Sequence, residues 1–143
     1  MKFSHVLVLT VQIFCILTLM KTGQIFPSNI FLLIAAIIFF LFGVWAAIEM
    51  RFRFHFLPAL LENSKLITTG PYSIVRHPIY SGTIFLTLIW IINDFTFFRF
   101  AIWLILVITL FIKSGMEEEI LQGEFEDYKD YQSKTSRLIP FVF

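Results

Sequence analysis

Four long runs of apolar side chains constrain the fold of this chain more than any other feature of its sequence. A helix that crosses a bilayer needs about 20 mostly apolar residues, because each residue adds ~1.5 Å along the helix axis. Hydrophobic residues make up 58% of the 143-residue chain and charged residues 15%, whereas about a quarter of the residues in a soluble domain are charged. We therefore predict an all-α polytopic membrane protein with about four transmembrane helices, over residues 3–21, 29–50, 76–93 and 95–115.

The third and fourth runs, Ile79–Ile92 and Phe100–Ile112, are shorter than a full span when only apolar residues are counted. The fourth helix gains length if Arg99 extends its charged end toward the interface. Asn93-Asp94 then forms a tight turn, so that the two helices make a hairpin. The first run resembles a signal peptide, but residues 20–23 offer no small-x-small cleavage site, and we expect a retained helix.

Basic residues are distributed unevenly between the two sides that four spans would create. Cytoplasmic loops carry the excess of Lys and Arg in membrane proteins. Nine basic residues would share one side with both termini and the middle loop, and only Lys21 and Arg99 would lie on the other. We therefore predict that both termini and the helical tail of residues 116–143 are cytoplasmic, with a plasma or inner membrane location in a bacterium. The nine are Lys2, Arg51, Arg53, Lys65, Arg76, Lys113, Lys129, Lys134 and Arg137.

Charge and cysteine content exclude several classes of function. The formal net charge of +1 gives no strong field to attract nucleic acid, and we expect no nucleic-acid partner. Cys15 is the sole cysteine, which rules out an intramolecular disulfide and a cysteine metal cluster. The three histidines lack the spacing of a metal site, so no metal is expected. A chain of this length predicts a single membrane-integral domain, residues 1–143.

The first polar motif lies at the end of the middle loop. Gly70-Pro71 indicates a turn, and Pro78 suits the first turn of the third helix. Arg76 and His77 would then lie at a helix entrance, where free N–H groups can hold a carboxylate. Tyr80 follows His77 by three residues and shares its helix face. The residues alone favour a basic, aromatic interfacial anchor over a ligand site.

The second motif is the acidic run Glu117-Glu118-Glu119, which follows the fourth apolar run directly. Carboxylates at a helix C-terminus oppose the helix dipole, and ionisable groups near the bilayer are costly and often functional. A helix that continues into the tail would remove the conflict, and residues 117–131 have helical apolar spacing. A solvated helix face and a site for a cationic ligand both remain open.

Both motifs resemble one known family. Thr68 to Tyr72 followed by Arg76 to Gly82, and then Glu117 to Leu121 with a closing Arg137-Leu138-Ile139-Pro140, are similar to the isoprenylcysteine carboxyl methyltransferase and phospholipid methyltransferase superfamily. The motifs cover about half of the chain, from Leu66 to Pro140. The resemblance implies that they converge at the cytoplasmic face to hold S-adenosyl-L-methionine.

Site residues follow from that resemblance by position. It implies catalytic roles for His77 and Glu118. It also implies a cofactor pocket, to which the backbone of residues 64–67 contributes. The cofactor's ammonium and sulfonium would be attracted by acids and aromatic faces. The implied cofactor-binding residues are Lys65, Leu66, Ile67, Tyr72, Arg76, His77, Pro78, Tyr80, Glu118 and Glu119.

Three departures from the family pattern concern the acceptor. Ser114 stands where the prenylcysteine enzymes carry a substrate arginine, although Lys113 is adjacent. Glu126 replaces a usual glycine, and the additional N-terminal helices of the larger enzymes are not found. Glu49 ends the second apolar run, where an ion pair with Arg53 four residues on is expected and a substrate role is the alternative.

The sequence thus predicts a membrane methyltransferase that uses S-adenosyl-L-methionine on a membrane lipid or lipidated acceptor. A carboxylate on a lipidated cysteine needs no base, whereas a lipid amine must lose a proton, which His77 or a glutamate would accept. The phospholipid amine N-methyltransferases are therefore the alternative to carboxyl O-methylation. A non-catalytic membrane scaffold that keeps the fold, and a membrane reductase, are the rivals from other classes.

Overall fold

The computed structural model describes residues 2–50 and 66–140, and it consists of helices joined by short turns. Lys65 and Arg53, for which roles were predicted, lie outside the described residues. No strand occurs in the two described ranges apart from a single bridge between Val75 and Ser136. The all-α prediction is confirmed. The elements are α1 (Lys2–Lys21), α2 (Ile30–Glu49), the 3₁₀ turn η1 (Gly70–Ser73), α3 (Pro78–Asn93), α4 (Phe97–Glu124) and α5 (Tyr128–Lys134).

Three of these helices, α1, α2 and α4, are long and apolar enough to cross a membrane. α3 is apolar but has only 16 residues, or ~24 Å at 1.5 Å per residue, which is shorter than the ~30 Å hydrocarbon core. It begins at Pro78, two residues later than predicted, because the N–H groups of Arg76 and His77 donate to Ser136 and Arg137 instead of starting a helix. The chain is an integral membrane protein with three candidate spans and one shorter apolar helix.

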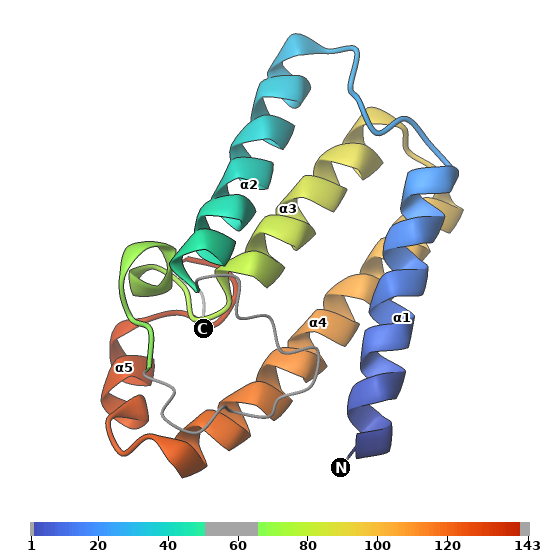
Figure 1. Ribbon diagram of the computed structural model, residues 1–143. Helices are drawn as coiled ribbons and strands as arrows, with labels where there is room; N and C mark the ends of the chain where they lie inside the picture. Colours follow the sequence, from blue (N-terminus) through green and yellow to red (C-terminus); the bar gives the residue numbers. More distant parts are fainter. Residues whose placement is uncertain (1, 51–65, 141–143) are drawn as a thin grey trace.

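The four long helices alternate in direction and pack in two pairs. α2 lies along α3 and α1 lies along α4 (Figure 1). The start of α3 and the end of α4 face one end of the bundle together with η1 and α5, which we call the α5 end (Figure 1). The turns 22–29 and 94–96 form the opposite end.

Close contact between α2 and α3 depends on Gly82. A Cβ on Gly82 would lie 3.1 Å from the Phe39 carbonyl oxygen and 3.3 Å from the Cα of Gly43. Small residues let helix backbones approach closely inside a membrane. The rings of Phe39 and Phe85 stack beside this contact, with centroids 4.9 Å apart. The close packing of α2 against α3 therefore fixes the position of the start of α3.

α4 continues to Glu124 and does not end near residue 115 as predicted. Glu117, Glu118 and Glu119 consequently lie within the helix, away from its C-terminal carbonyl groups, and the conflict with the helix dipole disappears. The helix then breaks at Phe125, whose backbone is extended, so residues 117–131 are not one continuous helix. The break turns the chain back and buries Tyr128 and Tyr131 of α5.

At the opposite end, Arg99 is buried, and its side chain reaches back to the turn before α4. Its Nη1 atom lies 3.0 Å from the Asp94 carboxylate and also donates to the Asp94 carbonyl oxygen. Gly23 leaves room for the guanidinium, since a Cβ there would lie 2.3 Å from Arg99 Cζ. The predicted turn between the third and fourth helices thus closes around an internal ion pair.

Candidate active site

The two polar motifs meet at the α5 end because the chain after α5 pairs with the start of α3. The Arg76 N–H donates to Ser136 O at 2.8 Å, and the His77 N–H donates to Arg137 O at 3.1 Å. These bonds flank the parallel bridge between Val75 and Ser136. They bring Arg76, His77 and Arg137 close to Glu118 of α4.

Glu118 is the centre of the resulting charged cluster, and its side chain is 2% exposed. Arg76 Nε lies 2.6 Å from Glu118 Oε1, and Arg137 Nη2 lies 2.6 Å from Oε2. Gln132 Nε2 donates to Oε2 at 3.3 Å. A buried carboxylate is tolerated only when such partners satisfy it, so Glu118 and its two arginines form one unit.

Arg76 also closes the end of α5. Its Nη1 atom donates to the carbonyl oxygens of Gln132 (3.1 Å) and Thr135. These carbonyls belong to the last turn of α5 and to the residue after it, where helix carbonyls lack partners in the helix. Arg76 therefore links α3, α4 and α5 through one guanidinium.

His77 lies between two carboxylates. Its Nδ1 atom is 3.4 Å from Glu117 Oε2, and its Nε2 atom is 3.5 Å from Glu118 Oε1, without the alignment of a hydrogen bond. Burial by itself lowers the pKa of the imidazole, but the Glu117 and Glu118 carboxylates outweigh burial and raise the pKa of His77 above its ordinary value. The surroundings therefore favour the charged imidazolium.

Tyr80 connects His77 and Glu117 to Lys113 of α4. Its ring stacks on His77 with a centroid distance of 5.4 Å and an interplanar angle of 2°. Its hydroxyl donates to Glu117 Oε1 at 2.5 Å. The ammonium of Lys113 lies 5.0 Å from the centre of the Tyr80 ring, within the range of a cation–π contact.

Tyr72, Tyr128 and Tyr131 are buried near the charged cluster. The Tyr131 hydroxyl donates to Tyr72 O at 2.6 Å. Burial raises the pKa of all three phenols, to about 12 for Tyr131, so they stay neutral and act only as hydrogen-bonding or stacking groups. In the described part of the chain, the buried hydroxyls of Tyr72 and Tyr128 have no hydrogen-bond partner.

A family model described as phospholipid methyltransferase matches residues 30–128. The match covers more than half of the 143 residues and includes α2, α3 and α4 with both motifs of the charged cluster. The chain belongs to the phospholipid methyltransferase family. No curated protein and no solved structure matches it.

Membership in the phospholipid methyltransferase family confirms the resemblance to the wider superfamily of membrane methyltransferases. Of the residues predicted from that resemblance, the structure brings together Arg76, His77, Tyr80 and Glu118, with Pro78 buried in the first turn of α3 and Tyr72 buried in η1. Glu119 is exposed and faces away from the cluster's ion pairs. Leu66 and Ile67 precede η1 and are partly buried.

Several residues of the cluster were not among the predicted site residues. Glu117 belongs to the acidic run, but the sequence alone does not show which of the three carboxylates faces His77 and Tyr80. Arg137 belongs to the closing motif and Lys113 is adjacent to Ser114, and both were predicted to be cytoplasmic basic residues without a role in the site. Gln132 and Gln12 carried no signal except their polarity, and Gln12 and Arg137 lie outside the range that the family model matches.

Glu49 stabilises the turn that presents Tyr72. It accepts a hydrogen bond from Thr69 Oγ1. Gly70 adopts a φ of +58°, and a Cβ there would lie 3.3 Å from Glu49 Oε2, so glycine both permits the turn and makes room for the carboxylate. The partner that the structure gives Glu49 is therefore the η1 turn.

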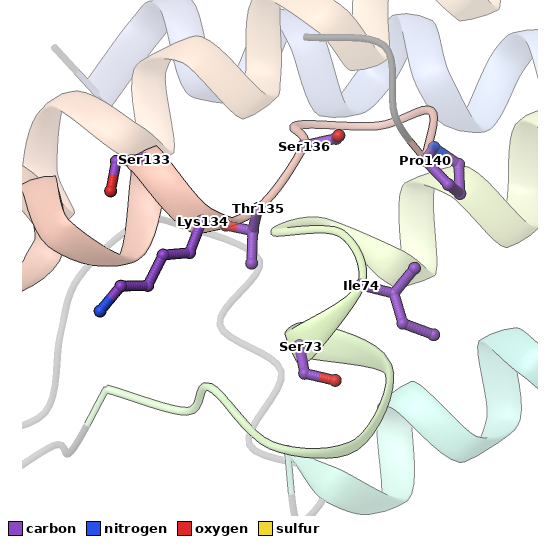
Figure 2. Close-up of a pocket in the computed structure, with 7 residues that line it drawn as sticks. All are labelled: Ser73, Ile74, Ser133, Lys134, Thr135, Ser136 and Pro140. Atoms are coloured by element: carbon purple, nitrogen blue, oxygen red, sulfur yellow. The ribbon is translucent and has the colours of Figure 1, made fainter.

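A pocket of about 360 Å³ lies between η1 and the chain that follows α5 (Figure 2). Ser73 and Ile74 line one side, and residues 133–136 with Pro140 line the other (Figure 2). Among the residues that the structure describes, none of the predicted cofactor-binding residues lines this pocket. It adjoins the paired segments that hold the cluster, without sharing the cluster's charged side chains.

Proposed function

We propose that this protein is a methyltransferase that uses S-adenosyl-L-methionine to methylate a membrane-associated acceptor, as isoprenylcysteine carboxyl O-methyltransferases do. The observation that carries the proposal is the convergence of the two family motifs in one buried cluster: Arg76 and His77 before α3 face Glu117 and Glu118 of α4. Structural ion pairs alone do not require an imidazole shared by two carboxylates beside a tyrosine ring. Perturbed titratable groups gathered in this way are typical of functional sites.

The donor set fits the cofactor in chemical kind. The cofactor has an ammonium and a sulfonium, which suit carboxylates and aromatic faces, and a carboxylate, which suits a guanidinium. Glu117, whose side chain is 22% exposed, is the more accessible of the two carboxylates. Arg137 is 27% exposed, so it is the cation of the Glu118 unit that can most easily turn toward a ligand. The proposed cofactor site also keeps the residues that the family resemblance alone implies, which are Leu66, Ile67, Tyr72, Pro78 and Glu119.

When bound, S-adenosyl-L-methionine supplies a methyl group on a sulfonium that is already a good leaving group. The protein's part is then to bind, to orient and to exclude water. In the proposal Glu118 fixes Arg76 and Arg137, while His77 and Tyr80 orient Glu117. The buried tyrosines keep the site apolar behind these charges.

A carboxylate is the better acceptor for this set of groups. Glu117 and Glu118 raise the pKa of His77, which disfavours the neutral imidazole that a base requires, and both carboxylates are engaged by cations or by Tyr80. Methyl transfer to a carboxylate oxygen needs no base, whereas transfer to a lipid amine requires a group that removes its proton.

The second candidate is methylation of a phospholipid amine. The description of the matching family favours it. In that reaction Glu117 would take the proton, because it is the more exposed carboxylate of the pair. Either acceptor would enter between helices from the bilayer, since the cluster lies at the end of apolar spans.

The test is transfer of labelled methyl groups from S-adenosyl-L-methionine to membranes that contain the protein. A label released as methanol by mild alkali identifies a carboxyl methyl ester, and alkali-stable label in phospholipid identifies N-methylation. The double variant Glu117→Gln, Glu118→Gln is the control. No label above that control, together with no binding of the demethylated cofactor product, would favour the scaffold interpretation.

The proposed orientation places the cluster and both termini in the cytoplasm, as the distribution of basic residues indicates. Replacing Ser133 by cysteine in a Cys15→Ala background provides a single thiol near the pocket at the α5 end. An impermeant thiol reagent should label it only after the cytoplasmic side is opened. Labelling of intact cells would reverse the orientation.

A further inference from the structure

Lys113 places a positive charge beside Tyr80 at the edge of the cluster, where Glu117 attracts it without forming a direct ion pair. Its ammonium donates to Gln12 Oε1 at 3.0 Å and lies over the Tyr80 ring. Glu117, one turn further along α4, faces Tyr80 and His77 instead. Within residues 2–50 and 66–140, Lys113 forms no ion pair. A partly buried cation at this depth is costly unless something compensates it.

The side chain of Gln12 holds the Lys113 ammonium in this position. It is a partly buried amide in the middle of α1, directly between the apolar residues Val11 and Ile13, and α1 packs along α4. A polar side chain inside a span is expensive unless it is hydrogen-bonded. The amide oxygen is neutral, so it holds the ammonium in place without cancelling its charge. A glutamate at the same position would cancel that charge.

We infer that Gln12 is a positioning residue for the proposed methyl transfer: it holds the Lys113 ammonium beside Tyr80, where this cation binds an anionic oxygen group of the acceptor. The inference rests on the proposed function for the identity of the acceptor, but the subsite itself is a property of Gln12, Lys113 and Tyr80. Its chemistry suits a carboxylate or a phosphate on an apolar chain. It also gives α1, which lies outside the matched range of residues 30–128, a role in the site beyond anchoring.

The test measures binding of three ligands that share one prenyl tail to the full-length protein in nanodiscs. These are farnesyl thioacetic acid, farnesyl phosphate and the uncharged methyl ester of the first. The wild type should bind at least one anion about tenfold or more tightly than the ester, since a hydrogen bond between charged groups contributes that much. The ligand that is preferred distinguishes a carboxylate source from a phosphate source.

Variants separate positioning from support of the fold. Lys113→Gln and Gln12→Leu should reduce the preference for anions to about twofold or less. Gln12→Glu should keep thermal stability, because it still holds Lys113, and should lose the preference, because it cancels the charge. Thr10→Val is the matched control, because Thr10 is exposed on the same helix and its hydroxyl donates to Val6 O of that helix; the preference of this variant should equal that of the wild type.

Two results would overturn the inference: equal affinity of the wild type for all three ligands, or an unchanged preference in Gln12→Leu. A purely structural Gln12 would lower all three affinities together and leave their ratio intact. Binding of the demethylated cofactor product is measured in parallel. If that product does not bind while the anion preference persists, the proposed function fails and the subsite stands; if it binds without any preference, only the subsite fails.

Discussion

The two ends of the helical bundle bury charge in different ways. At the opposite end, Arg99 is 1% exposed and pairs with Asp94, five residues earlier in the chain and 42% exposed. At the α5 end, Glu118 is paired with Arg76 and Arg137, which are 42 and 19 residues away. One pair is local and has a single, partly hydrated partner; the other is a network assembled from three segments.

The difference indicates which end can respond to a ligand. A local pair forms as soon as the turn between α3 and α4 forms, and Gly23 of the neighbouring loop closes over it. The network at the α5 end depends on the chain after α5 returning to the start of α3. It also contains more ionisable groups than a single pair needs. We therefore assign function to the α5 end and a structural role to the Asp94–Arg99 pair.

Among the variants that test this difference between the two ends, Glu118→Gln should have the largest effect on stability and on cofactor affinity. The change leaves Arg76 and Arg137 without a counter-charge, and breaking a buried pair costs about 3–5 kcal/mol of unfolding free energy. Affinity for S-adenosyl-L-methionine should fall at least about tenfold, which corresponds to ~1.4 kcal/mol. Thermal unfolding in detergent and calorimetric titration below the unfolding temperature measure the two effects.

Glu126→Gln is the matched control for that variant. Glu126 is an exposed acid after the break that ends α4, so its removal should change neither quantity measurably. Equal cofactor affinity of the wild type and Glu118→Gln would refute a role for the Glu118 network in binding.

A smaller effect, confined to stability, is expected at the opposite end. Asp94→Asn removes the counter-charge of buried Arg99, but Asp94 is partly hydrated, so the loss should be about 1–2 kcal/mol, less than for a fully buried pair. Cofactor affinity should stay within about twofold of the wild type. The same two measurements apply, and a loss of affinity as large as in Glu118→Gln would contradict the assignment of roles to the two ends.

The pH dependence of stability tests the charge of His77. Because the pKa of His77 is raised in the folded protein, its stabilising contribution is complete below the unfolded value of about 6.5. It is lost as the pH rises through the folded value. The difference in unfolding temperature between the wild type and His77→Gln should therefore be largest near pH 6 and shrink toward pH 9. A difference that grows with pH would mean that burial, not the two carboxylates, controls the imidazole.

The smallest effect is expected from the surface pair Asp130–Lys134 on α5. Both side chains are 67% exposed, and exposed pairs one helical turn apart contribute about 0.3–0.5 kcal/mol. Asp130→Asn should lower the unfolding free energy by no more than this, although it lies close to the cluster in sequence. A larger change, measured by the same thermal unfolding, would show that α5 depends on its surface charges more than on Tyr128 and Tyr131.

The sequence predicted the helices well where their apolar runs are long, and less well where polar segments pack together. α1 and α2 begin and end within a residue or two of their predicted bounds. α4 is longer than predicted, since an apolar run marks the membrane but not the end of a helix that continues into water. The break at Phe125 went unpredicted because it depends on the burial of Tyr128 and Tyr131 against distant residues.

The candidate site divides in a similar way. The motifs identified Arg76, His77, Tyr80 and Glu118 because these residues stand close to Gly-Pro and helix-start signals in a family pattern. Gln12 and Gln132 could not be found in this way, because their partners are distant in sequence. The partner of Gln12 is Lys113, 101 residues away, and the partner of Gln132 is Glu118, 14 residues away. The expected partner of Glu49, Arg53, lies outside the described residues, and the hydrogen bond that the structure adds comes from Thr69, 20 residues away.

By itself, the sequence determined that this chain enters a membrane as apolar helices and that it carries the two motifs of a methyltransferase family. Both properties follow from local information: hydropathy acts on each segment separately, and a motif is read residue by residue. Only the tertiary structure decided that Glu118 bridges Arg76 and Arg137, that His77 lies between two carboxylates, and that Gln12 holds Lys113. The physical reason is that a buried charge is stable only with partners, and these partners come from segments that meet only after the helices have packed.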